Sequence, residues 1–225
     1  MKRITVLLAE DHMIVREGFR KMLELEADVE VVGEAQDGRQ AVLLTKKLRP
    51  VVVLMDIAMP QLNGLEATRQ ILREMPATKV IILSAHSDDA YVNNATESGA
   101  VGFLLKQTSA QDVCRAIREV HGGKTFFSPS ISKRRDRINP QSSGRSGRRH
   151  KQGVMLTSRE MEVLQLVAEG KANKETASEL GIGLKTVEKH REHLMQKLDI
   201  HDTAGLTRYA ISTGVIESSV QLTVA

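Results

Sequence analysis

Apolar residues follow two different spacings along the first half of the chain. Short apolar runs with the length of β-strands recur five times, at residues 4–9, 29–34, 51–55, 79–83 and 101–105. The stretches between these runs place apolar residues three or four positions apart, which is the spacing of an amphipathic helix. Strands that are apolar throughout and alternate with helices predict a parallel sheet with helices on both faces. We therefore expect a five-stranded, doubly wound α/β domain over residues 1–122.

Helical spacing without strands returns in the last third of the chain. Thr157 and Glu160 have the spacing of a capping box in front of an apolar helical stripe. A Gly-rich turn then separates a short helix from a longer one, and a final helix is expected over residues 203–212. The pattern predicts an all-α, four-helix domain with a helix-turn-helix over residues 154–217, followed by a C-terminal tail, 218–225.

The segment between the two domains, residues 123–153, has a different composition. Ser, Gly, Pro and Arg dominate most of it and large apolar side chains are rare, so we expect a flexible linker. Its basic character is local, because the net charge is −1 for residues 1–127, +7 for 128–153 and −2 for 154–225. These charges either attract the phosphates of DNA or only keep the linker solvated, and the sequence favours neither.

Neither a membrane segment nor a disulfide framework is indicated. No apolar run approaches the roughly 18 residues that a membrane span requires. The first residues, MKRITVLLAEDH, lack the long apolar stretch of a secretory signal. The single cysteine, Cys114, lies in a helical pattern, where we expect a small buried residue, and it fits a reducing compartment. These features predict a soluble, cytoplasmic protein that does not associate with membranes.

Polar residues follow four of the predicted strands at their carboxyl ends. They are Glu10, Asp11, Asp56, Ser84 and Lys106. Taken singly, each has an ordinary interpretation as a turn residue, a helix cap or a solvated strand end. In a parallel sheet, however, the carboxyl ends of the strands lie at one edge, where ligands bind. The five side chains are therefore expected to meet there.

The chemistry of this group indicates phosphoryl transfer. Three neighbouring carboxylates repel one another unless a cation neutralises them. Oxygen ligands with few protein donors suit Mg²⁺, which often completes its coordination with water and phosphate oxygens. A carboxylate beside Mg²⁺ and a lysine can attack a phosphoryl group and become an acyl phosphate. We expect Asp56 to be that carboxylate, Lys106 to offset the phosphoryl charge, and Ser84 to hydrogen-bond the bound group.

Four segments, LLAEDH, VLMDIAMPQLNG, VIILSAH and GAVGFLLK, resemble the signatures of the bacterial response-regulator receiver domain, in the right order over residues 1–122. The resemblance implies a flavodoxin-like fold and phosphorylation of Asp56 by a sensor histidine kinase. It also implies Mg²⁺ bound by the carboxylates of Glu10, Asp11 and Asp56 and by the backbone carbonyl of Ala58. Glu10 stands where Asp is more common, but it remains acidic.

The same resemblance assigns a signalling role to two further positions. Ser84 and Phe103 match the pair whose rearrangement reports phosphorylation, and Ser84 with Lys106 would stabilise the phosphoryl group. Ser84 is one of the two hydroxyl residues usual at its position. The chain is expected to accept a phosphoryl group and to lose it slowly at most, so we do not expect an enzyme.

The segment ASELGIGLKTVEKHREHL has the helix-turn-helix form that places a second helix in the DNA major groove. An amphipathic surface helix without a DNA role would show a similar pattern. The longer stretch from LTSREMEVL to HLMQKL, however, resembles the LuxR-type output domain of NarL/FixJ regulators. That resemblance implies phosphate contacts by Lys185 and Thr186 and base-edge contacts by Glu188 and Lys189. Two residues at the start of the supporting helix would contact the DNA backbone, Asn173 and Lys174.

Two departures from the output-domain pattern affect helix starts. Gly183 stands where a capping Ser is usual, and Gly at an N-cap costs only a few tenths of a kcal/mol. Ala172 replaces a usual Ser or Thr, which removes one possible backbone contact. The near-neutral charge of the domain favours weak binding as a monomer and a need for dimers.

Together these features predict a two-component response regulator in which phosphorylation of Asp56 controls dimerisation and sequence-specific DNA binding. The expected partners are a sensor histidine kinase, double-stranded DNA, a second phosphorylated copy and the transcription machinery. One alternative is a phosphotransfer intermediate whose C-terminal module binds a protein. Another is DNA binding that does not depend on phosphorylation.

Overall fold

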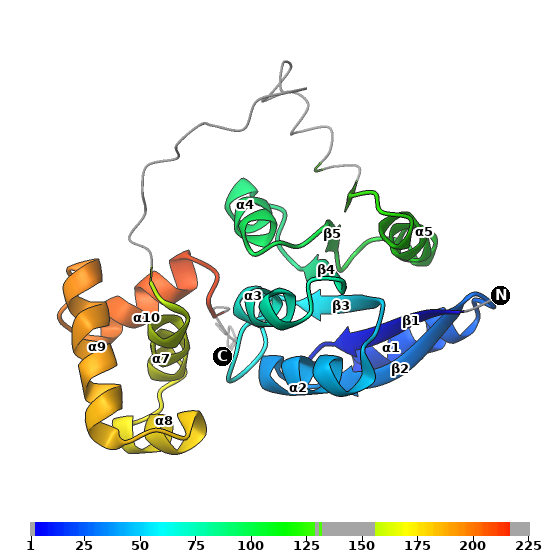
Figure 1. Ribbon diagram of the computed structural model, residues 1–225. Helices are drawn as coiled ribbons and strands as arrows, with labels where there is room; N and C mark the ends of the chain where they lie inside the picture. Colours follow the sequence, from blue (N-terminus) through cyan, green and yellow to red (C-terminus); the bar gives the residue numbers. More distant parts are fainter. Residues whose placement is uncertain (1–2, 129–130, 132–155, 217–225) are drawn as a thin grey trace, which may run out of the picture.

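The computed structural model describes residues 3–128, 131 and 156–216, so the expected tail and most of the expected linker lie outside the described residues. The first domain alternates strands and helices: β1 (Ile4–Ala9), α1 (Met13–Glu24), β2 (Val29–Ala35), α2 (Gly38–Leu48), β3 (Val52–Asp56), α3 (Gly64–Glu74), β4 (Lys79–Ser84), α4 (Asp89–Glu97), β5 (Gly102–Leu105), α5 (Ala110–His121) and β6 (Phe126–Phe127). The second domain is helical, as Figure 1 shows: α7 (Ser158–Ala168), α8 (Asn173–Leu180), α9 (Leu184–Leu198) and α10 (Thr203–Ser212).

The strands form one parallel sheet in the order β2-β1-β3-β4-β5-β6. The doubly wound α/β fold is confirmed, with a sixth strand, β6, added beside β5 to the five that were predicted. Phe126 is buried in the core on one face, Phe127 packs on the core of the other face, and Ile131 is buried there too. The predicted start of the linker at residue 123 is therefore too early. A strand of two residues is shorter than the apolar runs from which strands are predicted.

Alternate residues of each central strand enter separate cores on the two faces of the sheet. In β1, Leu7 and Ala9 belong to the core under α2, α3 and α4, whereas Val6 and Leu8 belong to the core under α1 and α5. The same two-sided burial explains why the predicted strands are apolar throughout, since both faces are covered by helices (Figure 1). Cys114 of α5 is buried in the second of these cores, as expected.

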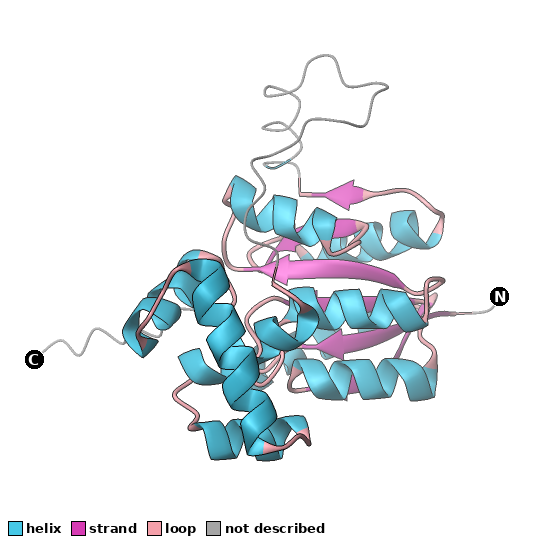
Figure 2. Cartoon of the chain, turned by 60° about the vertical axis from the view of Figure 1, so that its left-hand side comes forward, coloured by secondary structure: helices cyan, strands magenta, loops and turns pink. Residues whose placement is uncertain are grey.

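The second domain has a core of its own, formed by apolar residues from α7, α8, α9 and α10. Figure 2 shows this domain as helices joined by loops. The predicted capping box at the start of α7 is confirmed, because the Thr157 side chain accepts from the Glu160 amide and the Glu160 carboxylate accepts from the Thr157 amide at 2.8 Å. Glu160 Oε2 also accepts from Nζ of Lys197 at 2.7 Å. The start of α7 is therefore tied to the end of α9.

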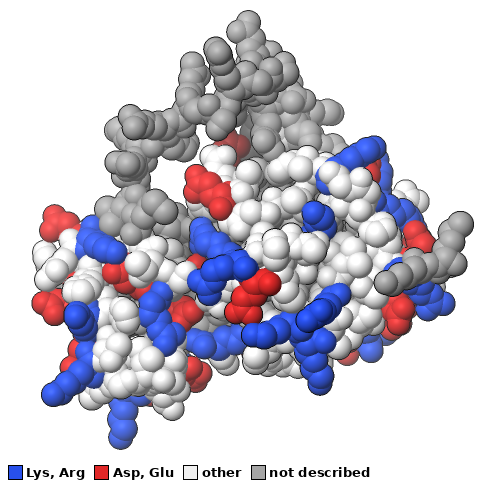
Figure 3. Space-filling model, in the orientation of Figure 1, with Lys and Arg blue, Asp and Glu red and all other residues white. Residues whose placement is uncertain are grey.

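Basic and acidic side chains are interspersed over both domains on the face seen in Figure 3. Neither domain is uniformly basic on this face. This distribution agrees with the near-neutral charge of each domain in the sequence. Within the described ranges, no helix combines the length and the apolar character that crossing a membrane requires.

Candidate functional site

The register of the sheet brings four strand ends to one edge. Glu10 directly follows the β1 residue that pairs with Met55, and Asp56 directly follows Met55 in β3. Lys106 directly follows the β5 residue that pairs with Ser84, the last residue of β4. Residues that lie far apart in the sequence thus reach the same edge because all these strands run parallel.

Lys106 joins the acidic residues of this edge. Its Nζ lies 2.8 Å from Oδ2 of Asp56 and 2.9 Å from Oε2 of Glu10. The side chains of Glu10 and Asp56 are almost fully buried, with 2% and 1% of their surface exposed. One ligand atom from each of Glu10, Asp11 and Asp56 lies within 4.8 Å of the others. The structure therefore brings together the acids and the lysine that the sequence places at strand ends.

Burial and charge both act on protonation in this cluster. Burial raises the pKa of Asp56 to about 6, and repulsion from Glu10 acts in the same direction, while Lys106 opposes both. Burial alone would lower the pKa of Lys106, but the carboxylates of Asp56 and Glu10 outweigh it and raise that pKa. Lys106 is therefore protonated at neutral pH. Three carboxylates face this single positive charge, so binding of a further cation is favoured.

The donor set fits a Mg²⁺ ion. Oδ1 of Asp56 is buried and accepts no hydrogen bond, so one oxygen of a buried carboxylate is available as a ligand. Glu10 and Asp11 add carboxylate oxygens nearby, and oxygen is the ligand that Mg²⁺ prefers. Ala58 follows the end of β3 by two residues and is half-buried. The role of its carbonyl as a ligand stays a prediction.

His12 is a neighbour of the acids that the sequence reasoning did not include. Its Nδ1 lies 3.1 Å from Oε1 of Glu10 and 2.9 Å from Oδ1 of Asp11. The charge of Asp11 raises the pKa of His12; burial opposes this increase, and the hydrogen bond with Glu10 adds to it. The only available signal in the sequence is its position directly after two acids.

The loop between β3 and α3 approaches Asp56 very closely. The Gly64 amide donates to the carbonyl oxygen of Ile57 at 2.8 Å, and the Asn63 side chain caps α3 by accepting from the Glu66 amide at 2.9 Å. A Cβ atom at Gly64 would lie 1.8 Å from the backbone oxygen of Asp56, so this position requires glycine. The Asn-Gly turn of the sequence thus starts α3 and closes the loop onto β3, the strand that carries Asp56.

Arg16 fixes the loop between β1 and α1. It is buried, and its Nη1 donates to the backbone oxygen of Glu10 at 2.7 Å while its Nε donates to Oε2 of Glu34 at 3.1 Å. These bonds hold the backbone that carries Glu10 and Asp11. The sequence reasoning missed Arg16 because an arginine in a helix is normally exposed.

Ser84 and Phe103 lie on neighbouring strands. Ser84 ends β4, is buried, and its Oγ accepts from the amide of His86 at 3.0 Å. Phe103 is fully buried in β5, in the core under α2, α3 and α4. The structure thus places Ser84 at the edge with Asp56 and Phe103 in the interior behind it. Their action as a switch pair stays a prediction.

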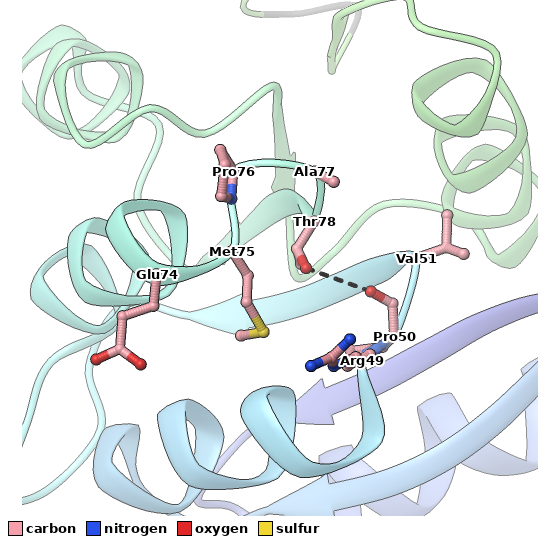
Figure 4. Close-up of a pocket in the computed structure, with 8 residues that line it drawn as sticks. All are labelled: Arg49, Pro50, Val51, Glu74, Met75, Pro76, Ala77 and Thr78. Carbon is pink, nitrogen blue, oxygen red and sulfur yellow. Dashed lines mark hydrogen bonds between the residues drawn. The ribbon is translucent and has the colours of Figure 1, made fainter.

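A cavity of about 410 Å³ lies at the opposite end of the sheet, where β3 and β4 begin (Figure 4). Residues 49–51 and 74–78 line it, and the Thr78 hydroxyl donates to the carbonyl oxygen of Pro50 at 3.4 Å. The acids of the candidate site lie at the other edge of the sheet, at the carboxyl ends of β1 and β3. This cavity is therefore separate from the acidic cluster.

The predicted recognition helix is α9. Its buried residues, Val187 and Leu194, face the interior of the second domain. Four residues with predicted DNA contacts are exposed on it: Lys185, Thr186, Glu188 and Lys189. The first domain therefore leaves this surface of α9 uncovered, a point on which the sequence was silent.

The start of α8 carries the two other predicted DNA contacts. Lys174 is exposed, whereas Asn173 is half-buried and its Oδ1 accepts from Nη1 of Arg191 at 3.0 Å. Arg191 of α9 also donates to Oγ1 of Thr203 at 2.6 Å. Arg191, which the sequence reasoning did not single out, thus ties the start of α8 and the start of α10 to the middle of α9.

Comparisons with known proteins agree with this architecture. Residues 6–118 match the family described as "Response regulator receiver domain", and residues 154–210 match "Bacterial regulatory proteins, luxR family".

The transcriptional regulatory protein LiaR of Bacillus subtilis is 41% identical over 208 residues, which are 92% of this chain and 96% of LiaR. The response regulator protein VraR of Staphylococcus aureus is 36% identical over 215 residues, 95% of this chain and 99% of VraR. A solved structure of the two-component response regulator RcsB–DNA complex aligns with a TM-score of 0.58 at 29% identity and covers 94% of this chain and 99% of that chain.

A buried acidic cluster at the strand ends of a flavodoxin-like domain, joined to a four-helix domain with a helix-turn-helix, is the architecture of a response regulator. This chain belongs to the LuxR family of response regulators. Its first domain is the receiver domain and its second is the LuxR-type output domain. The resemblance found in the sequence is thereby confirmed.

Proposed function

We propose that Asp56 accepts a phosphoryl group from a sensor histidine kinase and that this modification controls sequence-specific DNA binding, and thereby transcription, by the output domain. The proposal rests on the hydrogen bonding of the two oxygens of the Asp56 carboxylate. Its Oδ2 is paired with Lys106 at 2.8 Å, whereas its buried Oδ1 has no hydrogen-bond partner. A carboxylate held in this way beside a cation is suited to attack phosphorus.

In the proposed step, a carboxylate oxygen of Asp56 forms a bond to phosphorus while the bond from phosphorus to the imidazole nitrogen of the donor breaks. The electron pair of that bond stays with the imidazole nitrogen, and the product on Asp56 is an acyl phosphate. Lys106 offsets the negative charge on the phosphoryl oxygens, and the Ser84 hydroxyl donates a hydrogen bond to one of them. The chain acts as an acceptor that loses the group slowly at most, not as an enzyme.

When bound, Mg²⁺ supplies charge neutralisation and orients the phosphoryl oxygens. Glu10, Asp11 and Asp56 would hold it, together with the backbone carbonyl of Ala58. Arg16 contributes indirectly, because its bond to the Glu10 backbone keeps the first two acids in place.

The proposed output is DNA binding by two copies of the phosphorylated chain. Lys185 and Thr186 would contact phosphates, while Glu188 and Lys189 would reach base edges in the major groove. Their exposure supports this role, and the solved RcsB–DNA complex supports it by likeness. Two recognition helices would occupy half-sites about one helical turn apart. The proposal places the protein in the cytoplasm, with the transcription machinery as a further partner.

Labelling with a small phosphodonor such as acetyl phosphate and Mg²⁺ tests the proposal. The wild-type chain and the control Asp88→Asn are expected to gain acid-labile phosphate, because Asp88 is an exposed acid outside the cluster. Asp56→Asn is expected to gain none. Labelling of Asp56→Asn at the wild-type level would overturn the site assignment.

A further inference from the structure

The chain leaves the receiver sheet along β6, which covers the outer edge of β5 by pairing with it in parallel. Phe126 of β6 is 6% exposed and belongs to the core under α1 and α5, where the guanidinium of Arg115 lies 5.1 Å from the centre of its ring. Phe127 packs on the core of the other face. β6 is therefore anchored on both faces of the sheet, and this fixes where the next residue, Ser128, lies.

Hydrogen bonds join β5 and the segment that contains β6 at every second residue. The amide of Phe126 donates to the carbonyl oxygen of Val101 at 3.0 Å. The amide of Ser128 donates to the carbonyl oxygen of Phe103, also at 3.0 Å. In a regular parallel ladder, the next bond would run from the Leu105 amide to the carbonyl oxygen of Ser128. A side chain takes the place of that carbonyl, because the Leu105 amide donates to Oγ of Ser128 at 3.2 Å.

A turn in the chain explains this replacement. The carbonyl oxygen of Ser128 accepts from the amide of Ile131 at 2.8 Å, and Ile131 is 2% exposed in the same core as Phe103. The chain thus turns away from the edge of the sheet at Ser128. An amide without an acceptor at Leu105, which is half-buried, would cost free energy. The hydroxyl of Ser128 supplies the acceptor that the strand no longer offers.

The backbone that Ser128 contacts carries Lys106. Lys106 directly follows Leu105, and its amide donates to the carbonyl oxygen of Ser84 at 2.8 Å. The Thr108 amide closes a turn by donating to the carbonyl oxygen of Leu105 at 2.8 Å. Oγ of Ser128 lies 3.3 Å from Oγ1 of Thr108. The turn over residues 105–108 is therefore held by β4 on one side and by the Ser128 hydroxyl on the other.

The position of this turn decides where the lysine side chain reaches. Nζ of Lys106 lies 2.8 Å from Oδ2 of Asp56 and 2.9 Å from Oε2 of Glu10, and its side chain is only 18% exposed. Two short contacts with buried acids tolerate little displacement of the backbone from which the lysine extends. A misplacement of about 1 Å at a reacting group can slow a reaction about a hundredfold. The rate at which Asp56 accepts a phosphoryl group therefore depends on what holds the turn.

We propose that Ser128 is a positioning residue for phosphoryl transfer to Asp56, because its hydroxyl holds the turn that places Lys106 in the acidic cluster. The inference rests on the proposed phosphorylation of Asp56 and adds a residue to the machinery of that site. Ser128 acts through the backbone of Leu105 and the hydroxyl of Thr108. It lies in the segment that the sequence assigns to the linker, so the chain between the two domains takes part in building the phosphoryl site.

Initial rates of labelling of the full chain with acetyl phosphate and saturating Mg²⁺ test the proposal. Ser128→Ala is expected to slow labelling about tenfold, because the released turn shifts by less than about 1 Å. In Lys106→Met, which lacks the side chain that the turn places, the same change is expected to slow labelling by less than about twofold. A residue that only stabilises the fold would slow both chains by the same factor.

Further variants make the test independent of the folding of one chain. Ser128→Thr keeps the hydroxyl and is expected to label at close to the wild-type rate. Thr108→Val removes the other hydroxyl of the pair and is expected to slow labelling about threefold, again only when Lys106 is present. The matched control is Ser98→Ala, which is expected to leave the rate unchanged. Ser98 is 4% exposed, its Oγ donates to the carbonyl oxygen of Ala95 at 2.7 Å, and it precedes β5, whereas Lys106 follows the end of that strand.

Hydrogen exchange at the Leu105 amide gives a readout that needs no phosphodonor. The bond to Ser128 protects this amide in the wild-type chain. Ser128→Ala is expected to accelerate its exchange about tenfold, whereas Ser98→Ala is expected to leave it unchanged. Exchange at the wild-type rate in Ser128→Ala would overturn the positioning role.

Failure of this inference and failure of the proposed function are distinguishable. Labelling at the wild-type rate in both Ser128→Ala and Thr108→Val would overturn the positioning role and leave the proposed function intact. Slowing by the same factor with and without Lys106 would do so as well. A wild-type chain that takes up no phosphate would overturn the proposed function, and the role of Ser128 would fall with it.

Discussion

Nζ of Lys106 lies 2.8 Å from Oδ2 of Asp56, although 50 positions separate the two residues in the chain. This pairing opposes the effect of burial, which raises the pKa of Asp56 to about 6. It therefore helps to keep the carboxylate ionised at neutral pH, and only the ionised form can attack phosphorus. The ionisation of Asp56 therefore depends on a residue that follows a different strand, β5.

Lys106→Met is expected to slow phosphate incorporation from a small phosphodonor by about a hundredfold, because a charge that stabilises the phosphoryl oxygens is lost. Loss of the lysine also removes the attraction that opposes the raised pKa of Asp56. Initial rates of labelling at saturating Mg²⁺ measure the effect. The control is Lys46→Met, since Lys46 is a surface lysine whose side chain is 68% exposed and pairs with Glu74. Equal rates in the two variants would contradict the role of Lys106.

Gly64→Ala is expected to lower the free energy of unfolding by about 1–3 kcal/mol, because the added Cβ would overlap the backbone oxygen of Asp56. Labelling of Asp56 should fall as well, since the overlap displaces the strand end that carries it. Gly18→Ala is the matched control, because a Cβ at Gly18 in α1 meets nothing within 4 Å. That change should raise the free energy of unfolding by about 0.5–1 kcal/mol. Urea unfolding of both variants tests the prediction, and a Gly64→Ala chain as stable as wild type would refute it.

Glu160→Gln is expected to destabilise the output domain by about 1 kcal/mol at neutral pH, because it weakens the capping interaction at the start of α7. Burial of Glu160 opposes its ionisation, but the hydrogen bonds from Lys197 and from the Thr157 backbone outweigh burial and lower its pKa. A lowered pKa in the folded state gives stability that is present above the ordinary value of 4.5 and is lost as the pH falls through the folded value. The difference between wild type and variant should therefore shrink on acidification.

Calorimetry of the full chain over a pH series measures this difference. Glu179→Gln is the control, because Glu179 is exposed on α8 and should give little change at any pH. A Glu160→Gln effect that is the same at neutral and acidic pH would show that the charge of Glu160 plays no part.

Lys189→Ala is expected to change base preference, whereas Lys185→Ala is expected to weaken binding evenly across sequences. Both lysines are exposed on α9, but the resemblance places Lys189 at base edges and Lys185 at phosphates. Loss of a phosphate contact should also reduce the slope of the logarithm of affinity against the logarithm of salt concentration by about one. Selection from random DNA with each variant measures the preference. An unchanged preference in Lys189→Ala would contradict the assignment.

The receiver site is largely predictable from the sequence because its geometry follows from strand order and direction alone. Asp56 ends β3, and Glu10 and Lys106 directly follow the ends of β1 and β5. Parallel strands deliver their carboxyl ends to one edge of the sheet. The short strand β6 escapes prediction, because two residues carry too little periodic signal. Helix bounds in the output domain are equally predictable, since the capping box and the turn glycines mark them directly.

Contacts that depend on the relative placement of elements are not predictable in this way. Arg16 lies in an ordinary helical pattern, and only the fold turns its guanidinium toward the backbone of Glu10. In the sequence, the polar face of α7 that includes Gln165 looks solvated, because local spacing says nothing about docking between domains. In the structure, Gln165 is buried against the loop between β3 and α3, so this polar face is an interface between the two domains.

The central claim is that phosphorylation of Asp56 controls DNA binding by the whole chain. A phosphodonor titration that follows molecular mass in solution and DNA affinity together tests it most directly. In the wild-type chain, a rise to the mass of a dimer and a rise in affinity are expected at the same phosphodonor concentration, and neither is expected in Asp56→Asn. Equal affinity of wild type and Asp56→Asn, with and without phosphodonor, would contradict the account.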